Sequence, residues 1–567
     1  MIRNRNRIFG WLALSVVFGS AAHAADATGQ AVLHELVLLP DSHMPAPALQ
    51  DGTVNVSAID VADKPSLVEH LQGLIGHVID RSVIDSAKQI VTQHFSDVGH
   101  PFIDVGFPQQ DVTDGMLRMV VAEYHVNTVN VIGNAWFSDD LIRSAAGLEP
   151  GDVIDKAALD RRLQEFGASP FVKVTPEFSP GAKPDTTNVT LRVADQAPVQ
   201  VSLGYSDSGS ASTGWNRWSL AVTATDPTLS GTQISYNFTS SDGVLQHNHS
   251  ETEGADAIYE LHAASLLIPL PSGDRVTLSS SLARQIPQLG ADLGSVGVNT
   301  NFGWDYSHPI VRGPAARWGA TGETIGLAYD FKRSNNNLAF GGKSVQRNFT
   351  VLSQFSLHYT ASFDNAWGLL QAQDTLVLSP GGMTPENTNR ALRPNGTAQS
   401  GTLGTNAQYA YNRLMLTQLV PLPHDYGLVL RTTAQGSSTT LLASERLSIA
   451  GIDAVRGYQE FGVSGSQGVV LTTELRGPNF SPSSLITGHD GSDSAQLHVF
   501  SDVGRSWNPT ASSSAPGATT TASVGFGGQM MVADNLSVRL EQGWQLLRTS
   551  LQGVHGAFLH AAVTATW

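Results

Sequence analysis

Beyond about residue 197, hydrophobic and polar residues alternate one by one, with almost no helical periodicity. This pattern predicts strands with two different faces, separated by turn residues. Sixteen such segments are present, an even number that suits a closed antiparallel barrel with both ends on one side. They lie at residues 199–207, 217–225, 233–241, 259–270, 275–284, 294–310, 318–331, 348–363, 369–378, 406–422, 427–436, 468–476, 495–507, 522–531, 536–547 and 557–567.

The connections between these segments alternate in length. Tight turns such as 227–231 and 271–274 alternate with longer polar stretches such as 242–256 and 387–404. Outer-membrane barrels have this asymmetry, with short periplasmic turns and longer external loops. A soluble β-helix would show a fixed repeat of about twenty residues, and the sequence shows none. Residues 197–567 are therefore predicted to form a transmembrane antiparallel β-barrel of about 16 strands.

The last predicted strand has one consistently apolar side. Every second residue from Leu559 to Trp567 is apolar, which indicates a face turned toward lipid. The chain ends on an aromatic residue, which resembles the terminal signal that outer-membrane barrels present to the barrel-assembly machinery. Phenylalanine is the usual last residue there, so Trp567 departs from the pattern, although an interfacial aromatic fits physically.

The preceding part of the chain has mixed helical and strand periodicity, and its order of elements repeats once. Both units read strand, helix, helix, strand, strand, and each is long enough for one small core. In the second unit, Ser138 and Asp155 are predicted to cap the two helices, and Gly147 to end the first of them. The predicted strands are 33–39, 54–61, 102–107 and 115–123 in the first unit, and 126–132, 172–178 and 189–193 in the second.

This repeated order resembles two POTRA domains, the polypeptide-transport-associated modules of outer-membrane translocators. The second unit contains short sequence motifs similar to those of the family, at residues 131–134, 148–152, 170–171 and 178–181. The end of the first unit, residues 98–115, is similar to the same place in two-partner secretion transporters. The alternative is a pair of generic α+β binding domains. We therefore predict an N-terminal segment with a first POTRA domain at 25–122, a second at 123–196, and the barrel at 197–567.

The first residues have the organisation of a secretory signal peptide. Three arginines precede an apolar stretch at 8–19 and a small-residue site that ends at Ala24, which predicts removal of residues 1–24. Cleavage would leave a net charge near −19 (−16 minus 3), and such acidity argues against nucleic acid as a partner. The chain has no cysteine, which excludes disulfides and thiolate metal sites. No later apolar run reaches about 18 residues, so no transmembrane helix is expected.

The motifs that could carry catalysis are incomplete. Residues 341–344 have the ending of a Walker motif, but Asn337 stands where its first glycine is required. Residues 204–208 approach a nucleophile elbow without its closing glycine. His247 and His249 form a pair in a predicted loop and lack an obvious third ligand. We predict a protein that is not an enzyme, with no catalytic residue, metal or cofactor.

The stretch at 445–465 lies between two predicted strands, and it should therefore be a loop. It nevertheless carries the motif Val455-Arg456-Gly457-Tyr458, in which an arginine stands between an aliphatic residue and a glycine and an aromatic follows. A solvent-exposed loop does not need this combination. We predict that the loop folds inward into the barrel.

A carboxylate that could meet this arginine lies in the second predicted strand after the loop. Asp502 occupies an alternating position in that strand, between Phe500 and Gly504. A buried guanidinium needs a carboxylate partner to offset its desolvation, so we predict that Arg456 meets Asp502 on the inner wall. The alternative is that both are ordinary surface charges.

The loop motif and the Phe500-x-Asp502-x-Gly504 motif resemble the two motifs that two-partner secretion outer-membrane transporters pair inside their barrels. The resemblance implies that Arg456 and Asp502 form a conformational latch. Tyr458 and Phe500 would pack beside it, and Gly457 and Gly504 would leave room for close approach. It also implies a non-enzymatic translocator in the outer membrane of a Gram-negative bacterium, with POTRA domains in the periplasm. Such a type V system recognises an unfolded exoprotein, a β-helical adhesin or haemolysin, and exports it through the pore.

Two other functions stay open at this level. An outer-membrane assembly or insertion factor belongs to the same superfamily, but such factors commonly carry three to five POTRA domains. A passive porin with periplasmic domains would need no latch. The sequence does not identify the exported partner, its modification in transit, a plug helix or the oligomeric state.

Overall fold

The computed structural model of the chain has two compact units that divide between Gln196 and Ala197, and each is described by itself. The predicted signal peptide, the residues that follow it up to 30, and the histidine pair at 247 and 249 lie outside the described residues. The structure describes residues 31–41, 44, 52–167, 169–210, 213–228, 231–242, 258–270, 272–287, 293–310, 320–340, 343–392, 405–488, 491–509, 517–549 and 556–567.

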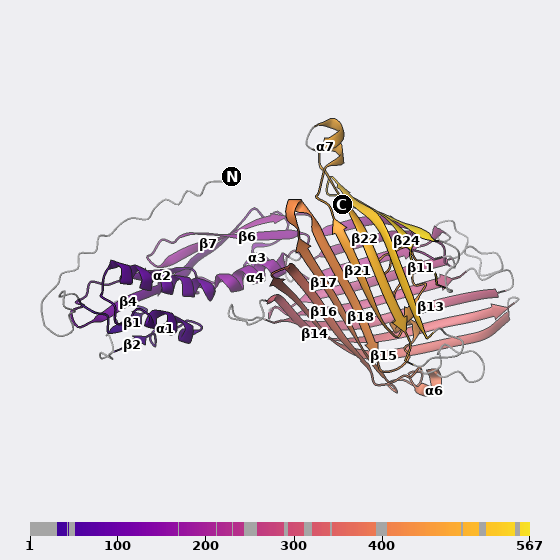
Figure 1. The fold of residues 1–567 in the computed structure, drawn as a ribbon, viewed down its shortest axis with the longest axis horizontal. Helices are drawn as coiled ribbons and strands as arrows, with labels where there is room; N and C mark the ends of the chain where they lie inside the picture. Colours follow the sequence, from indigo (N-terminus) through magenta and orange to yellow (C-terminus); the bar gives the residue numbers. More distant parts are fainter. Residues whose placement is uncertain are drawn as a thin grey trace. The chain divides into compact units, whose positions relative to one another are not determined.

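The N-terminal unit begins with a four-stranded sheet and two helices (Figure 1). The strand order is β2-β1-β4-β3, in which β1 pairs in parallel with both β2 and β4. Helix α2 turns one side chain per helical turn into the core, and Val83, Ala87, Val91 and Phe95 are buried there. The elements are β1 (Glu35–Leu39), β2 (Thr53–Asn55), α1 (Lys64–Gln72), α2 (Arg81–Asp97), β3 (Ile103–Gly106) and β4 (Met116–Glu123).

A second, smaller α+β domain follows in the same unit. Its three strands have the order β5-β7-β6, so β6 is an edge strand. The predicted helix caps are confirmed: the side chains of Ser138 and Asp155 accept hydrogen bonds from backbone N–H groups of their helices, and Gly147 ends the first helix with a left-handed backbone. The elements are β5 (His125–Ile132), α3 (Asp139–Ala146), α4 (Lys156–Phe166), β6 (Val172–Pro180) and β7 (Thr186–Asp195).

The C-terminal unit is a closed barrel of sixteen antiparallel strands, which confirms the predicted fold class (Figure 1). The barrel closes where β25 pairs with β8. Its strands are β8 (Val199–Ser206), β9 (Arg217–Thr225), β10 (Gln233–Ser240), β11 (Ile258–Pro269), β12 (Arg275–Ile286), β13 (Leu293–Pro309), β14 (Ala320–Phe340), β15 (Lys343–Asn365), β16 (Gly368–Ser379), β17 (Tyr409–Pro421), β18 (Gly427–Ser437), β21 (Gln467–Arg476), β22 (Asp493–Trp507), β23 (Ala518–Val532), β24 (Leu536–Gln545) and β25 (Ala557–Thr566).

The hairpin of β14 and β15 is longer than the alternation predicts. The sequence pattern ends β14 at 331 and starts β15 at 348, but the strands pair from Phe340 and Lys343 onward. Asn335, Asn336 and Asn337 interrupt the pattern because asparagine is depleted in strands. The backbone of these three residues nevertheless pairs with β13 and β15, so the strand continues through them. Residues 341 and 342 of the incomplete Walker motif lie outside the described residues.

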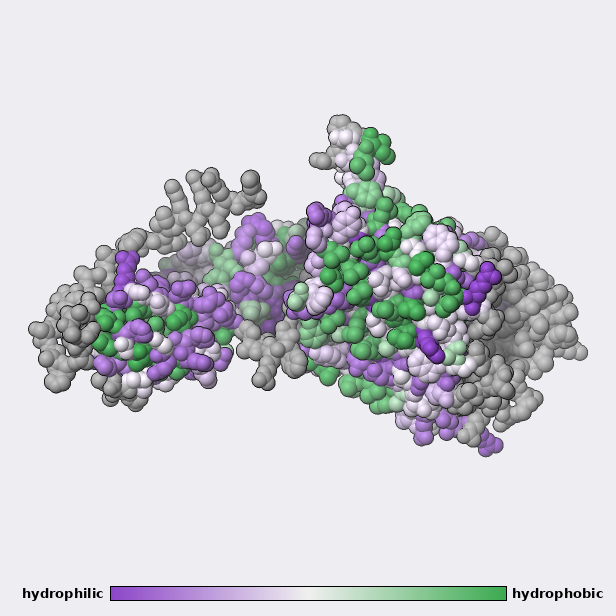
Figure 2. Space-filling model, in the orientation of Figure 1, coloured by the Kyte–Doolittle hydropathy of each residue, from purple (hydrophilic) through white to green (hydrophobic). Residues whose placement is uncertain are grey.

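The alternation sorts side chains between the two faces of the barrel wall. On β22, Leu497, Val499 and Val503 are exposed, whereas Phe500 and Asp502 are buried. Apolar residues cover much of the outer surface in Figure 2. This is the arrangement of a barrel that meets lipid outside and encloses polar groups inside. Among the described residues, no helix combines the length and the hydrophobicity that crossing a membrane requires.

Candidate functional site

The stretch between β18 and β21 forms a packed structure of its own inside the wall. It contains a 3₁₀ turn, η2 (Ala443–Glu445), and a two-stranded hairpin of β19 (Leu447–Ser448) and β20 (Ser464–Gly465). Its apolar residues form a buried cluster with the inward-facing Val470 of β21, made up of Leu447, Ile449, Ala450, Val455, Tyr458, Val463 and Val470. The loop at 445–465 is therefore folded inward against the strands, as predicted.

Arg456 and Asp502 meet in this loop–wall contact. The Arg456 guanidinium donates from Nε to Oδ2 and from Nη2 to Oδ1 of Asp502, each over 2.8 Å. The backbone N–H of Arg456 donates to Oδ2 as well, over 3.2 Å. Both residues are 2 % exposed, so neither is an ordinary surface charge. A planar fork against a carboxylate is the strongest geometry available to an arginine pair.

Two further carboxylates complete the site, and the sequence reasoning missed both. Nη1 of Arg456 lies 2.9 Å from Glu474 Oε1 on β21 and 2.9 Å from Glu541 Oε2 on β24. Both glutamates are buried, at 3 % and 1 % exposed. The alternation of the strands could have indicated both glutamates, because each occupies a position whose side chain is expected to point into the barrel. Arg456 thus joins three strands of the wall rather than one.

Other arginines of the barrel strands balance the excess negative charge around Arg456. Glu474 also pairs with Arg431 and Arg476, at 3.0 and 2.7 Å. Glu541 pairs with Arg539 at 2.8 Å. Each of the two glutamates therefore has a cation besides Arg456, which offsets the cost of removing its charge from water. When Arg456 leaves, these two carboxylates keep a partner, whereas Asp502 has no other ion pair within the described residues.

The two aromatic residues of the motifs have different partners: Phe500 contacts the arginine, and Tyr458 bonds to the backbone of the wall. The Phe500 ring lies 3.5 Å from the guanidinium carbon, which is a close cation–π contact. The Tyr458 hydroxyl accepts from the backbone N–H of Ala522 over 3.2 Å and contacts the carbonyl oxygens of Ala522 and Leu547. Phe500 thus packs beside the pair as the resemblance implies, whereas Tyr458 belongs to the buried apolar cluster of the loop.

Glycines allow the loop backbone to touch the wall. Gly457 has φ +86°, and a Cβ placed on it would lie 3.0 Å from the carbonyl carbon of Gly543 on β24. Gly543 was not identified from the sequence, and it is equally restricted. A Cβ placed on it would lie 2.6 Å from the backbone nitrogen of Gly457. Gly504 is flanked by Val455 of the loop, at 3.0 Å from such a Cβ. The contact therefore requires two facing glycines as well as the charges.

The base of the loop has a second buried anchor, also missed from sequence. Glu445 is 1 % exposed and accepts from Lys332 Nζ on β14 over 2.9 Å. Gln354 of β15 and the Tyr411 hydroxyl of β17 donate to the same carboxylate, over 3.1 and 3.0 Å. The loop is thus fixed to β14, β15 and β17 at its beginning, and to β21, β22 and β24 at Arg456.

Trp567, the predicted C-terminal signal, extends the last barrel strand along β8. Its backbone exchanges two hydrogen bonds with Val201, of 2.8 and 2.9 Å, and its side chain is 65 % exposed. The described residues contain no cluster of three or more potential metal ligands.

A groove runs along the edge strand of the second α+β domain. It has a volume of about 670 Å³ and lies between α4 and β6. Leu163 and Phe171 supply apolar lining, and Lys173 lies on the strand itself. Among the strands that the structure describes, β6 pairs with β7 alone, so its other edge can accept a further strand.

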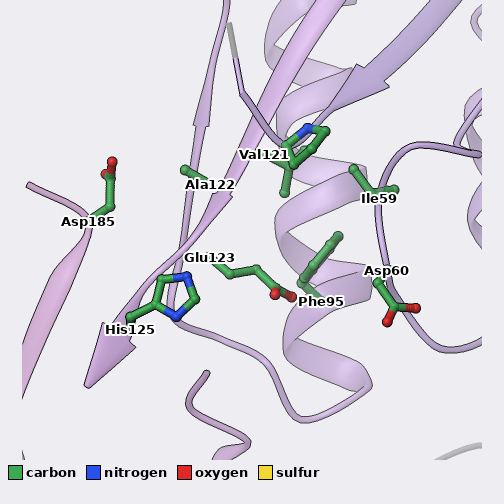
Figure 3. A pocket seen from close by; sticks show the side chains of 9 residues that line it. Ile59, Asp60, Phe95, Val121, Ala122, Glu123, His125 and Asp185 are labelled. Atoms are coloured by element: carbon green, nitrogen blue, oxygen red, sulfur yellow. The ribbon is translucent and has the colours of Figure 1, made fainter. Parts of the chain in front are cut away.

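A second cavity, of about 270 Å³, is lined by residues of both α+β domains, with His125 and Asp185 coming from the second (Figure 3). The Glu123 side chain points toward the side that holds Phe95 and Asp60, and His125 lies opposite. Burial raises the pKa of Glu123 above its ordinary value, and the nearby His100 and His125 oppose this shift. The carboxylates of Asp60, Glu123 and Asp185 and the ring of His125 line this cavity.

Sequence comparison matches two families to this chain. The family described as "Haemolysin secretion/activation protein ShlB/FhaC/HecB" matches residues 185–528. The POTRA family, described as "Surface antigen variable number repeat", matches residues 124–195. The second match confirms the POTRA resemblance of the second domain.

Individual relatives are distant in sequence and similar in fold. The "Heme/hemopexin transporter protein HuxB" of Haemophilus influenzae is 20% identical over 427 residues, which cover 74% of this chain and 71% of the relative. The structure of CdiB from Escherichia coli superposes with a TM-score of 0.75 at 16% identity, over 94% of this chain and 90% of that one. CdiB from Acinetobacter baumannii has a TM-score of 0.67 at 14% identity, over 97% and 91% of the two chains.

Proposed function

The chain belongs to the haemolysin secretion/activation protein family ShlB/FhaC/HecB, and from this premise we propose that it exports a secreted partner protein by two-partner secretion. The exported protein would cross the outer membrane through the barrel. The observation that carries the proposal is the loop at 445–465, which lies inside the wall and is fixed there by Arg456. A passive pore has no need of such a loop.

The Arg456 site acts as a latch in this proposal. Charge-assisted hydrogen bonds to three strands hold the loop inward, and they can exchange for water when the loop moves. Removing one partner of a buried ion pair typically costs about 3–5 kcal/mol. That is too little to unfold a barrel of sixteen paired strands, but enough to change the population of loop positions by orders of magnitude.

The route suits an extended chain rather than a folded domain. A barrel of this strand number encloses an aqueous channel once nothing occupies it. The periplasm supplies no ATP, so another source of free energy must drive export. Folding of the exported protein outside the cell would supply it, because a folded protein cannot return through the pore. A partner that folds spontaneously into a β-helix, such as an adhesin or a haemolysin, fits this requirement.

Recognition of the unfolded partner would take place at the POTRA domains, placed in the periplasm. The free edge of β6 and the apolar groove beside α4 support this step, because an extended segment can add to the edge and place alternate side chains in the groove. Trp567 would present the last strand to the barrel-assembly machinery. The proposed role is transport, in which the protein would not act as an enzyme and would need no cofactor.

The test of the latch is Arg456→Ala with Arg505→Ala as a matched control. Arg505 lies on the same strand as Asp502 but is exposed. In cells that carry the partner gene, export by Arg456→Ala should fall at least about tenfold, while the barrel still inserts and shifts on heating in electrophoresis. Arg505→Ala should export normally. Normal export by a correctly inserted Arg456→Ala protein would show that the latch is not required.

A further inference from the structure

The turn that joins β21 to β22 carries a short helix, α7 (Pro482–Thr487), that presents two large apolar side chains to the outside. Leu485 is 76% exposed and Ile486 is 85% exposed. No other large hydrophobic residue in the described part of the chain has a larger exposed fraction than Ile486. An exposed apolar pair on a barrel protein calls for an explanation, because turns on this scale are normally polar.

The helix is held firmly, so the exposure does not come from a frayed end. Asp493 accepts from the Ser481 hydroxyl over 2.6 Å and from the backbone N–H of Ser483 over 2.8 Å. Beneath the helix, Phe480 and Ala495 exchange two backbone hydrogen bonds, of 2.9 and 2.7 Å. Ser481 caps the first turn. The two apolar side chains are therefore presented in a defined direction.

The surface beneath the helix is continuous with the lipid-facing wall. Three outward side chains of the two strands that form its stem, Leu475, Leu497 and Val499, are apolar and exposed. Figure 1 shows α7 to the side of the barrel wall, and Figure 2 shows apolar surface on the helix, on its stem and on the wall below. The sequence has no Asp, Glu, Lys or Arg between Arg476 and Asp490. An apolar extension of the lipid belt, whose charged residues are confined to the ends of the turn at Arg476, Asp490 and Asp493, is suited to the boundary between headgroups and acyl chains.

We propose that α7 is an interfacial membrane anchor whose Leu485 and Ile486 insert into the bilayer leaflet next to the barrel's short turns. The occupant is lipid rather than protein, because the apolar surface adjoins the lipid belt and two side chains are far too little for a specific protein interface. Such an anchor restrains the depth and tilt of the barrel at β21 and β22, the strands that carry Glu474 and Asp502. The proposal rests on the barrel's place in a membrane and not on export.

The chain has no cysteine, so single cysteines can report on this contact without further changes. Ile486→Cys is labelled with an NBD fluorophore in the full-length mature protein and reconstituted into phosphatidylcholine vesicles. Leu497→Cys, on the lipid-facing side of β22, is the positive control. Ser272→Cys, in the β11–β12 turn at the same end of the barrel, is the matched turn control. Heat-dependent mobility in electrophoresis verifies that each variant is folded.

The label at 486 should behave as the label at 497 does. Vesicles with a nitroxide on the lipid acyl chain should reduce its emission about twofold or more, with a blue-shifted maximum and weak quenching by aqueous iodide. The label at 272 should respond mainly to iodide. Strong iodide quenching at 486 without nitroxide quenching would place α7 in water and overturn the proposal. Protection from both quenchers would indicate a protein contact and would overturn it as well.

Discussion

At the scale of single residues, the site depends on the particular chemistry of arginine and glycine. A guanidinium can donate to Asp502 as a fork and still reach Glu474 and Glu541 with its remaining nitrogen, which the point charge of a lysine cannot do. The backbone next to it must approach β24 closely, and Gly457 supplies the left-handed conformation that this approach requires. The ion pairs of Arg456 therefore depend on Gly457, which lets the loop backbone come close enough to the wall.

Gly457→Ala tests the requirement for close approach. Alanine at φ +86° costs about 1–2 kcal/mol, and its Cβ would press on the backbone of Gly543 at 3.0 Å. We expect a barrel that folds normally but whose loop leaves the wall more often, with larger and more frequent conductance steps in planar bilayers. Gly436→Ala is a suitable control, because no atom lies within 4 Å of a Cβ there. Equal conductance records for the two variants would contradict this account.

Asp195 gives the POTRA domain matched at residues 124–195 a defined pH dependence. Burial raises its pKa, but backbone N–H groups of Phe137, Trp136 and Ala135 outweigh burial, so the pKa lies below its ordinary value. A lowered carboxyl pKa stabilises the fold above the unfolded pKa of about 3.9, and this contribution disappears as pH falls through the folded value.

Asp195→Asn should accordingly remove part of the acid sensitivity. We expect residues 25–196 of the wild type to lose more unfolding free energy between pH 6 and pH 3 than the variant does, in urea titrations followed by circular dichroism. At pH 6 the variant should be the less stable of the two. A pH dependence unchanged by the substitution would show that the three backbone contacts do not act on the ionised form.

At the scale of elements, the loop at 445–465 is a bridge between two parts of the wall. Glu445 fixes its start to β14, β15 and β17, and Arg456 fixes its middle to β21, β22 and β24. These two buried contacts have different consequences when they break. Loss of Arg456 frees the middle of the loop and leaves the base in place, so the base acts as a hinge.

Glu445→Gln tests the hinge. Glutamine keeps the volume but removes the charge that neutralises Lys332, which leaves a poorly paired ammonium and an amide N–H₂ facing other donors. We expect the loop base to become sensitive to proteases added from outside the cell, with a loss of export that Arg456→Ala does not increase further. Lys332→Met combined with Glu445→Gln should recover part of the protection. Additive export defects in the Arg456→Ala and Glu445→Gln double variant would argue against one shared loop.

At the scale of the whole molecule, an apolar outer surface joins a polar interior on the same strands. The exposed apolar residues of β22 alternate with buried polar ones, and this arrangement leaves the barrel without a favourable state in water. The α+β domains of residues 31–196 have complete cores of their own.

The mature chain should therefore need detergent or lipid, whereas residues 25–196 should not. We expect the full chain to aggregate when detergent is removed, and the fragment to remain monomeric in size-exclusion chromatography and to capture an unfolded secreted partner. A full chain that stays monodisperse without detergent would contradict the barrel's placement in a membrane. A fragment that aggregates would show that the two cores do not stand alone.

The sequence by itself determined the strand periodicity, the number of barrel strands, the POTRA-like order of elements and the pairing of Arg456 with Asp502. These features are recorded in local alternation, in caps such as Ser138, and in short motifs. Glu474, Glu541 and Glu445 were decided only by the tertiary structure, because an inward polar residue is ordinary in any barrel. The register between strands distant in sequence selects which of those residues face the loop. The same is true of Gly543 and of the exposed pair on α7, since closeness across the lumen and exposure beside the wall depend on how the strands close.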